Sequence, residues 1–434
     1  MLGKKSGQFS LFQYITLDQL VPQDYFLRKV DRSVDFAPIR KLLESQYCQD
    51  NGRPSVDPEV VFRIVLIGFL YNLSDHRLFS ELQMHAGFRW FIKYDFNEKL
   101  PDRTTIVKLR KRWGNKVFDQ ILTQLVAQCI EAGLVAGEKL IVDGTIIKAN
   151  AAHNSLEAVK PEKTVLEYTK QFDDDGSDEP PKGSSSRKAY DPDFHGEKFS
   201  NQTHRSKTDP DARLYRKGKG KEAYLSYLGH YLVDGKVIVS AMATKATGIA
   251  EREAALVLLD KARNNLGIKP QSLLADKGYG SGEFLAQLLD RGIQPLVSMT
   301  KKQIEELPQW RRKTRVLKNY RKRKAELRAA KARNYTRIIN SSRKYQRAYR
   351  YRTIVEHRYG EAKSCHGMGK ARYRGLEQVD IQVIMTAIAQ NIKRLANNRG
   401  HKKPVQENVM VMQERIPLNS IHILTHYRIL ALSS

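Results

Sequence analysis

The 434 residues of the chain carry a formal net charge of +28, an excess of positive charge that indicates a polyanionic partner. Hydrophobic residues make up 41% of the chain, which is ordinary for a globular protein and excludes a disordered basic tail. Three widely spaced cysteines exclude a disulfide framework and a structural zinc site, and the lack of a long apolar run excludes a membrane partner, so we expect a cytoplasmic protein.

Residues 1–136 are predicted to be helical throughout. Asp57 and Pro58 mark a helix start, with Asp as the N-cap and Pro at the first helical position, and apolar residues recur behind them at helical spacing. A second helix is expected with Asp102 or a neighbouring Thr as its N-cap, and with an apolar stripe that continues from Val107 to Ile121.

This second helix also has a basic face. Three of its residues, Arg110, Lys111 and Arg112, are candidates for contact with the phosphates of a nucleic acid. A solvated basic face would have the same composition, so both interpretations stay open at this point.

From residue 137 to residue 300 the pattern changes to short apolar runs separated by turn residues, which is typical of strands alternating with helices. Strands are predicted over 140–142, 223–233, 236–244, 272–275 and 293–297, and helices over 251–265 and 282–289. The dipeptide Asp234-Gly235 suits a tight hairpin turn between the second and third strands. This order favours an α/β fold with a mixed sheet flanked by helices, in which ligands bind at strand ends.

Two segments interrupt the alternation. Residues 151–221 are polar and rich in turn residues and are predicted to be a flexible insertion. Residues 301–348 are predicted to be a basic helical insertion, because the chain has 19 Lys or Arg from Lys301 to Arg350, with tyrosines interleaved. Its run Arg321, Lys322, Arg323 and Lys324 is a candidate for salt-sensitive binding of nucleic acid, and a self-repelling surface helix is the alternative.

Three acidic residues are candidates for catalysis. Asp143 and Asp276 each follow a short apolar run directly, although an Asp before Gly in that position is also ordinary turn chemistry. Glu356 belongs to a set with Tyr349, Arg352 and Lys363 that shares a sector of roughly 60° if one helix carries all four. An exposed helix on which Glu356 only pairs with Arg352 is the competing interpretation.

The set Tyr349, Arg352, Glu356 and Lys363 has the spacing of the Y-R-E-K signature and resembles that of DDE transposases of bacterial insertion sequences, in the branch of the IS-four and IS-five groups. Asp143 in Asp-Gly-Thr and Asp276 in Ala-Asp-Lys-Gly-Tyr-Gly resemble the first two catalytic acids of that family. The resemblance implies a ribonuclease-H-like core with an N-terminal helical DNA-binding region. It also implies that Tyr349, Arg352 and Lys363 grip the terminal DNA strand.

Three carboxylates that meet in a basic protein would repel one another unless a cation compensated them. Oxygen ligands without Cys or His favour two Mg²⁺ or Mn²⁺ ions, held by Asp143, Asp276 and Glu356. The sequence therefore predicts metal-dependent DNA cleavage and strand transfer. A nuclease without strand transfer and a DNA-binding repressor without catalysis are the alternatives.

The resemblance also sets expectations for partners and organisation. The partners would be double-stranded DNA, as terminal inverted repeats and as target, and a second copy of the chain on DNA, in a bacterial, nucleoid-associated setting. We expect a helical DNA-binding region over 1–136, a catalytic core over 137–300 and 349–397, the basic insertion between them, and a tail over 398–434.

Overall fold

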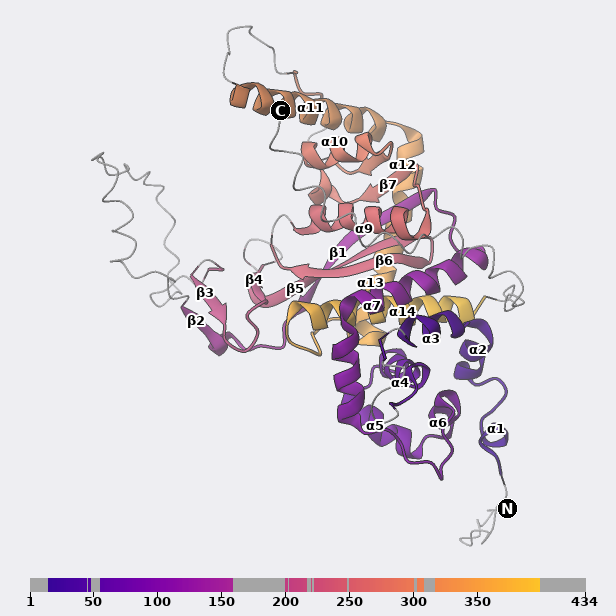
Figure 1. The fold of residues 1–434 in the computed structure, drawn as a ribbon. Coiled ribbons are helices and arrows are strands. Elements are labelled where there is room, and N and C mark those ends of the chain that lie inside the picture. Colours follow the sequence, from indigo (N-terminus) through magenta and orange to yellow (C-terminus); the bar gives the residue numbers. More distant parts are fainter. Residues whose placement is uncertain are drawn as a thin grey trace, which may run out of the picture.

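The computed structural model describes residues 15–44, 46–47, 55–158, 200–201, 203–216, 220, 222–247, 250–299, 303–307 and 317–398. In this part of the chain the N-terminal helices lie at one end, a sheet lies in the middle, and the basic helix α11 lies at the other end (Figure 1). None of the helices in these ranges has the length and apolar character needed to cross a membrane. The predictions for 159–199 and for the tail beyond residue 398 lie outside the described residues.

The described part of residues 1–136 is helical, as predicted. Its helices are α1 (Leu17–Leu20), α2 (Phe26–Ser33), α3 (Ala37–Glu44), α4 (Pro58–Leu70), α5 (Asp75–Met84), α6 (Ala86–Ile92) and α7 (Arg103–Glu131). Both predicted N-caps are confirmed: the carboxylate of Asp57 accepts the backbone N–H of Glu59 at 2.8 Å, and that of Asp102 accepts the N–H of Thr104 at 2.7 Å.

A mixed sheet forms the centre of the molecule. Its strands are β1 (Lys139–Lys148), β4 (Arg213–Tyr215), β5 (Tyr224–Asp234), β6 (Val237–Lys245), β7 (Ser272–Ala275) and β8 (Gln294–Val297). The order is β4-β5-β1-β7-β8, and β6 pairs with β5 on the edge that β4 also uses. β1, β7 and β8 are parallel, whereas β5 is antiparallel to β1, β4 and β6. The predicted α/β fold with a mixed sheet flanked by helices is confirmed.

One strand differs from its prediction. The sequence predicted a strand that ends at Asp143, whereas β1 continues to Lys148. The reason is a change of partner: parallel pairing with β7 stops at Ile141, and antiparallel pairing with β5 carries the strand onward. The Asp143-Gly144 pair, which favours a turn in isolation, is therefore held in the middle of a strand. The other predicted strands and helices of this region lie within one residue of β5, β6, α9 (Ala250–Leu266), β7, α10 (Gly282–Asp290) and β8.

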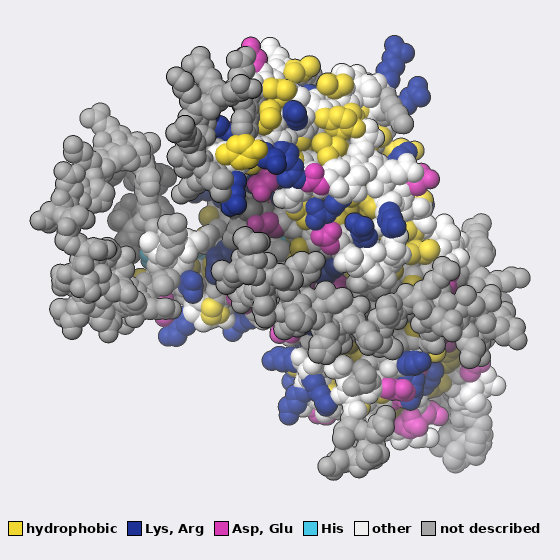
Figure 2. Space-filling model, turned by 45° about the horizontal axis from the view of Figure 1, so that its top comes forward, with side chains coloured by type: hydrophobic (Ala, Val, Ile, Leu, Met, Phe, Trp, Pro, Cys, Tyr) yellow, Lys and Arg dark blue, Asp and Glu magenta, His cyan; other side chains and the backbone are white. Residues whose placement is uncertain are grey.

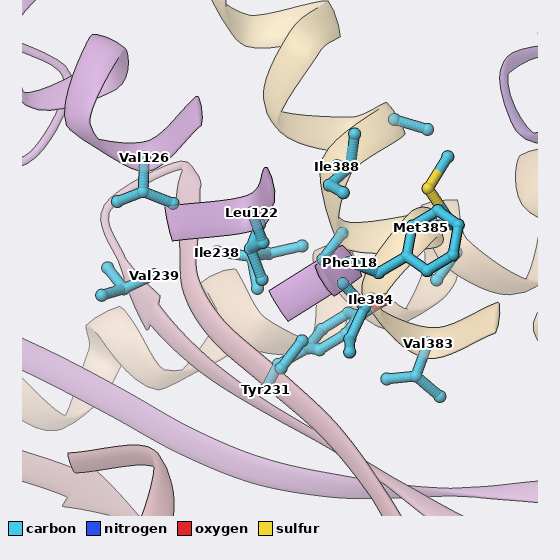
Figure 3. Close-up of a cluster of buried hydrophobic side chains, with 14 of the residues drawn as sticks. Phe118, Leu122, Val126, Tyr231, Ile238, Val239, Val383, Ile384, Met385 and Ile388 are labelled. Atoms are coloured by element: carbon cyan, nitrogen blue, oxygen red, sulfur yellow. The ribbon is translucent and has the colours of Figure 1, made fainter. Parts of the chain in front are cut away.

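Helices cover both faces of the sheet (Figure 1). α9 packs on β5 and β6, and α14 (Leu376–Ala396) packs on the same two strands from the side that α7 shares. Figure 3 shows Phe118 and Leu122 of α7, Ile238 of β6 and Ile384 of α14 meeting in one buried cluster. Because α14 also contacts α2 and α4, the N-terminal helices and the sheet share one hydrophobic core and position each other.

The segment predicted as a flexible insertion has regular structure at both ends. η1 (His153–Ser155) and β2 (Leu156–Ala158) follow β1, and β2 pairs with β3 (His204–Ser206) as a small separate sheet. β4 then joins the main sheet. The expectation of flexibility was therefore wrong for these two ends, where backbone pairing across the insertion orders the chain.

The predicted basic insertion contains the long helix α11 (Leu317–Asn340), which lies along α10 and contacts β8. Gly282 permits this close approach, because a Cβ there would stand 2.7 Å from both the Cβ and the carbonyl oxygen of Ala329. Arg333 and Arg337 bind Glu305 at 2.7 and 2.6 Å, and these contacts lower the pKa of Glu305 to about 2. Part of the positive charge of α11 thus fastens the helix.

The signature residues do not share one α-helix as predicted. The chain passes from α12 (Arg343–Tyr349) through the 3₁₀ turn η3 (Arg350–Arg352) into α13 (Thr353–His366). A 3₁₀ turn winds more tightly than an α-helix, so the angular positions of Tyr349 and Arg352 differ from those of a continuous helix.

Candidate active site

A hollow of about 1250 Å³ opens beside β1. The three acids that the sequence singled out, Asp143, Asp276 and Glu356, all line it. They come from three separate elements, which are β1, the end of β7 and α13. The structure therefore brings the predicted acids to one site.

Asp143 is the most deeply placed of the three. Parallel pairing aligns Ile141 of β1 with Leu274 of β7, so a step of two residues along both strands leads to Asp143 and Asp276 side by side. Only 15% of the Asp143 side chain is exposed, and its carboxylate accepts the N–H of Gly144 at 2.9 Å. Burial, together with the nearby negative charges of Asp276 and Glu356, raises the pKa of Asp143 to about 6.

Asp276 follows β7 directly, as predicted. One of its carboxylate oxygens accepts the N–H of Gly278 at 2.7 Å and caps the 3₁₀ turn η2 (Lys277–Tyr279). The turn chemistry that competed with a catalytic role in the sequence is therefore present. It engages Oδ1, and Oδ2 makes no hydrogen bond among the described residues.

Arg352 connects Glu356 to Asp143. Its guanidinium lies 3.3 Å from the carboxylate of Glu356 and 3.4 Å from that of Asp143. Burial works against the charge of Arg352, but the acids around it raise its pKa above the ordinary value. Glu356 itself is 57% exposed, so the ion pair that competed with a catalytic role also exists and faces solvent.

Two further signature residues lie nearby. Lys363 is exposed and lines the hollow, and it belongs to the same helix, α13, as Glu356. Tyr349 does not line the hollow: it is half-buried at the end of α12, where its ring lies 5.3 Å from that of Tyr345. Its hydroxyl group is close enough to Arg352 to influence the charge of the guanidinium.

Tyr359 fixes α13 against the sheet. Its hydroxyl donates to the carbonyl oxygen of Asp143 at 2.5 Å and accepts the N–H of Tyr231 at 3.0 Å. The rings of Tyr359 and Tyr231 stack with centroids 4.8 Å apart. The sequence gave no sign of this polar contact, which ties the helix of Glu356 to the backbone of Asp143.

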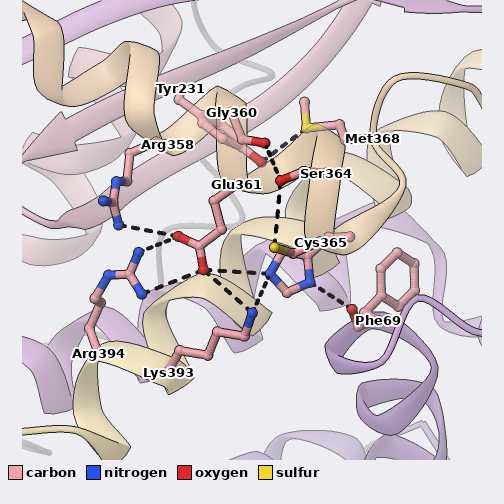
Figure 4. Close-up of polar contacts among 11 residues, drawn as sticks. Phe69, Tyr231, Arg358, Gly360, Glu361, Ser364, Cys365, Met368, Lys393 and Arg394 are labelled. Carbon is pink, nitrogen blue, oxygen red and sulfur yellow. Dashed lines mark hydrogen bonds and ion pairs between the residues drawn. The ribbon is translucent and has the colours of Figure 1, made fainter.

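The other end of α13 is fastened by charge. The carboxylate of Glu361 forms ion pairs with Arg358, Lys393 and Arg394 (Figure 4). It also lies 3.7 Å from the ring nitrogen of the buried His366. Burial alone would raise the pKa of Glu361, but His366 and the surrounding cations lower it below the ordinary value. This cluster joins α13 to α14.

A fourth acid, Glu251, also lines the hollow, and sequence reasoning missed it. It stands in the first turn of α9, where an acidic residue is ordinary because it complements the helix dipole. Burial, followed by the charges of Asp276 and Asp143, raises its pKa. Only the packing of α9 over β1 reveals its neighbours, so no local pattern would have found it.

The residues of the hollow have the donor chemistry of a divalent-cation site. Their ligand atoms are carboxylate oxygens, which Mg²⁺ and Mn²⁺ prefer. Five acids line the hollow, with Glu222 as the fifth, and they outnumber its three cations, which are Lys148, Arg352 and Lys363. Across the described residues, however, no three His, Cys, Asp or Glu side chains stand close enough together to hold an ion as they are placed. Arg352 lies between Asp143 and Glu356, so an ion that binds both acids must displace it.

The predicted DNA-binding residues of α7 fall into two groups. Arg110 is 3% exposed, pairs with both carboxylate oxygens of Asp75 at 2.9 Å, and lies over the ring of Tyr373. Its assignment as a DNA contact was therefore wrong for this structure, because its charge is already satisfied inside the protein. Lys111 and Arg112 are exposed, and Arg112 donates to the carbonyl oxygen of Gln46 at 2.6 Å.

The predicted DNA-binding residues of α11 lie on its first half. Arg321, Lys322 and Lys324 are exposed, and Arg323 is half-buried. On the face shown in Figure 2, Lys and Arg side chains are spread among Asp and Glu side chains instead of forming one uninterrupted patch.

Two family models match the chain. The model described as Transposase domain (DUF772) matches residues 15–112, and the model described as Transposase DDE domain matches residues 136–392, which is more than half of the chain. Among solved structures, a pre-cleavage Mos1 transpososome is 9% identical, covers 70% of this chain and 81% of its own, and has a TM-score of 0.18. A Mos1 transposase paired-end complex with the left transposon end has the same coverage and TM-score and is 8% identical.

Proposed function

This chain belongs to the transposase DDE domain family and is a DDE transposase, and from that premise we propose that it moves an insertion sequence by cutting DNA at terminal inverted repeats and joining the ends to target DNA. In this proposal Asp143, Asp276 and Glu356 are the three catalytic acids. The chain is of the Y-R-E-K type, and Tyr349, Arg352 and Lys363 grip the terminal DNA strand.

One observation carries the assignment of the acids. Three carboxylates that are far apart in the sequence line one hollow, and a single guanidinium contacts two of them. A structural role would leave such a cluster with enough cations to balance it. Burial is the main cause that raises the pKa of Asp143 to about 6, and the charges of Asp276 and Glu356 act in the same direction.

DDE transposases generally use divalent metal ions, and we propose that this one takes two Mg²⁺ or Mn²⁺ ions on Asp143, Asp276 and Glu356. When bound, two such ions supply activation of the attacking oxygen and neutralisation of the leaving oxygen at phosphorus. The exposed side chain of Glu356 is able to turn away from Arg352 because the backbone of α13 is held independently by Tyr359.

The chain's own cations then position the DNA. Arg352, Lys363 and Lys148 line the same hollow as the acids, so a phosphate drawn to them comes to rest beside the carboxylates. Displacement of Arg352 by a phosphate would uncover both of the acids it contacts. The exposed cations of α11 and of α7 extend the basic surface beyond the hollow and would follow the rest of the duplex.

The test uses the full chain, DNA with its terminal repeats, and Mg²⁺. Asp143→Asn, Asp276→Asn and Glu356→Gln should each lower the cleavage rate by about 10³-fold, the scale on which lost transition-state electrostatics are measured. Each variant should still bind the repeats within about twofold, because no phosphate contact is removed. Glu253→Gln, an exposed residue outside the hollow, is the matched control and should cleave normally. Full cleavage by all three variants would refute the proposal.

Two alternatives predict other products from the same protein. A nuclease without strand transfer would cut the repeats but leave pre-cleaved ends unjoined to a target plasmid. A DNA-binding repressor would bind the repeats and give no product that depends on Mg²⁺. We further propose that two copies act together on a pair of ends, so that the complex sediments as a dimer on DNA.

A further inference from the structure

Glu251 reaches into the active site from the side opposite α13. A Cβ built on Gly144, the residue after Asp143, would lie 3.3 Å from Oε1 of Glu251. A Cβ built on Gly278, two residues after Asp276, would lie 3.8 Å from Oε2 of the same side chain. The carboxylate of Glu251 therefore lies between the backbone segments that carry the first two catalytic acids.

The carboxylate of Glu251 is not compensated. Although the side chain is half-buried, it makes no hydrogen bond or ion pair with any of the residues that the structure describes. The helix dipole of α9 favours an acid in the first turn but does not require its side chain to enter the hollow, because Glu253 lies in the same turn and is exposed to solvent. A half-buried carboxylate beside two others is stable only if something positive joins them.

A second, independent feature lies at the same place. His230 of β5 is fully buried opposite Gly144, and its Nε2 contacts Thr244 at 2.7 Å while its Nδ1 has no partner among the described residues. This Nδ1 lies 3.2 Å from the position of a Cβ on Gly144, so it is directed at the space that Glu251 enters. Burial lowers the pKa of His230 to about 3, and a neutral ring does not offset the charge of Glu251.

We propose that Glu251 is a fourth carboxylate of the active site and binds a divalent cation together with Asp143 and Asp276. This inference rests on the proposed function, since it takes the same hollow to be the metal site. Asp143 lies in β1, Glu251 lies in α9, and Asp276 directly follows β7. A cation bound by all three would therefore hold α9, β1 and β7 together. Gly144 keeps the approach to Glu251 open, because a Cβ there would lie only 3.3 Å from the carboxylate of Glu251.

The test measures metal binding without DNA and without turnover. The full chain is freed of metal and titrated with Mn²⁺, and the free ion is followed by its paramagnetic resonance signal. Glu251→Gln should weaken the affinity for Mn²⁺ by about 10-fold or more, the scale for loss of a group that supports a metal site. Glu253→Gln makes the same chemical change two residues away and should leave the affinity unchanged. Glu251→Asp keeps a carboxylate and should restore part of the lost affinity.

The outcomes separate this inference from the proposed function. If Glu251→Gln binds Mn²⁺ as tightly as the wild type while Asp143→Asn binds weakly, the role of Glu251 is overturned and the assignment of the three acids stands. If Asp143→Asn binds and cleaves like the wild type, the proposed function itself fails. Equal weakening by Glu251→Gln and Glu253→Gln would also overturn the inference, because it would reflect only the net charge at the start of α9.

Discussion

The two ends of α13 carry the same side chain in opposite electrostatic settings. Near the start of the helix, Glu356 shares a single guanidinium with Asp143, in a hollow that Asp276, Glu251 and Glu222 also line. Further along the helix, the single carboxylate of Glu361 forms ion pairs with three cations and also contacts the ring of His366. Glu361 therefore holds α13 in place through charges that the protein itself balances. Glu356 keeps a carboxylate whose charge a bound cation could neutralise.

The pKa shifts follow the same division. The pKa of Asp143 is raised to about 6, because burial and neighbouring acids act together against its charge. The pKa of Glu361 is lowered although burial opposes it, because the cations prevail. A cluster of carboxylates with too few cations favours binding of an additional cation. A carboxylate surrounded by an excess of cations instead stabilises the packing of the helix that carries it.

Replacing Glu356 or Glu361 by glutamine should give the largest difference between the two settings. Glu356→Gln should lose cleavage by about 10³-fold and keep its free energy of unfolding, because only an exposed ion pair is removed. Glu361→Gln should do the reverse. It should lose about 2 kcal/mol of unfolding free energy, because buried cations are left unpaired, and keep the cleavage rate of the folded protein. Urea unfolding and a single-turnover cleavage assay measure the two quantities.

The pH dependence of Glu361→Gln adds a check on sign. A carboxylate whose folded pKa is lowered contributes stability above its unfolded pKa of 4.5 and loses it as the pH falls through the folded value. The difference in stability between wild type and Glu361→Gln should therefore be largest near neutral pH and shrink below pH 4.5. A difference that grew on acidification would contradict the assignment of Glu361 as a charged anchor.

Arg352 is the cation of the hollow that contacts two of its acids, Asp143 and Glu356. Arg352→Gln should raise the affinity of the DNA-free protein for Mn²⁺ by roughly 5-fold, because a positive charge between the acids is removed and two unit charges about 4 Å apart in water interact by about 1 kcal/mol. It should lower the affinity for the terminal repeats by about 10-fold, the scale of one charge-assisted phosphate contact. Arg352→Lys keeps the charge and should change Mn²⁺ binding little. Weaker Mn²⁺ binding by Arg352→Gln would mean that Arg352 orders the acids and does not compete with a cation.

Much of the architecture was readable from the sequence because it depends on local pattern. Apolar periodicity and caps located the helices at Asp57 and Asp102, and short apolar runs located β5 to β8 within one residue. The length of β1 was not readable, since it depends on pairing with β5, a strand that begins more than seventy residues later. Pairing of that kind leaves no mark on the strand's own sequence.

The residues of the candidate site also fall into those that the sequence could predict and those that it could not. Asp143, Asp276 and Glu356 were predicted as catalytic acids because their spacing and their neighbours resemble a family signature, and all three line one hollow. Glu251 has no such motif, and its first-turn position has an ordinary explanation in the helix dipole. Arg110 shows the opposite error. It belongs to a basic run, yet its partners Asp75 and Tyr373 are distant in the sequence and remove its charge from the surface.

The same contrast recurs on α11, where the smallest effects are expected. Lys322 and Lys324 are exposed, whereas Arg337 is buried against Glu305. Lys322→Ala and Lys324→Ala should each lower the slope of log affinity against log salt concentration by about 1, because each exposed cation that meets a phosphate releases about one counterion. The result at moderate salt is a loss of only a few-fold in DNA affinity, with no change in stability, and filter binding over a salt series measures it.

Arg337→Ala is the matched variant for this experiment, because it removes one positive charge from the same helix. It should lower the unfolding free energy by about 1 to 3 kcal/mol, since it leaves the Glu305 contact incomplete. Its salt slope should stay close to that of the wild type, because a guanidinium already bound to a carboxylate has little charge to offer a phosphate. Equal slopes for Lys322→Ala and Arg337→Ala would mean that α11 acts on DNA only through its net charge, and the division between fastening and presented charges would then not extend beyond α13.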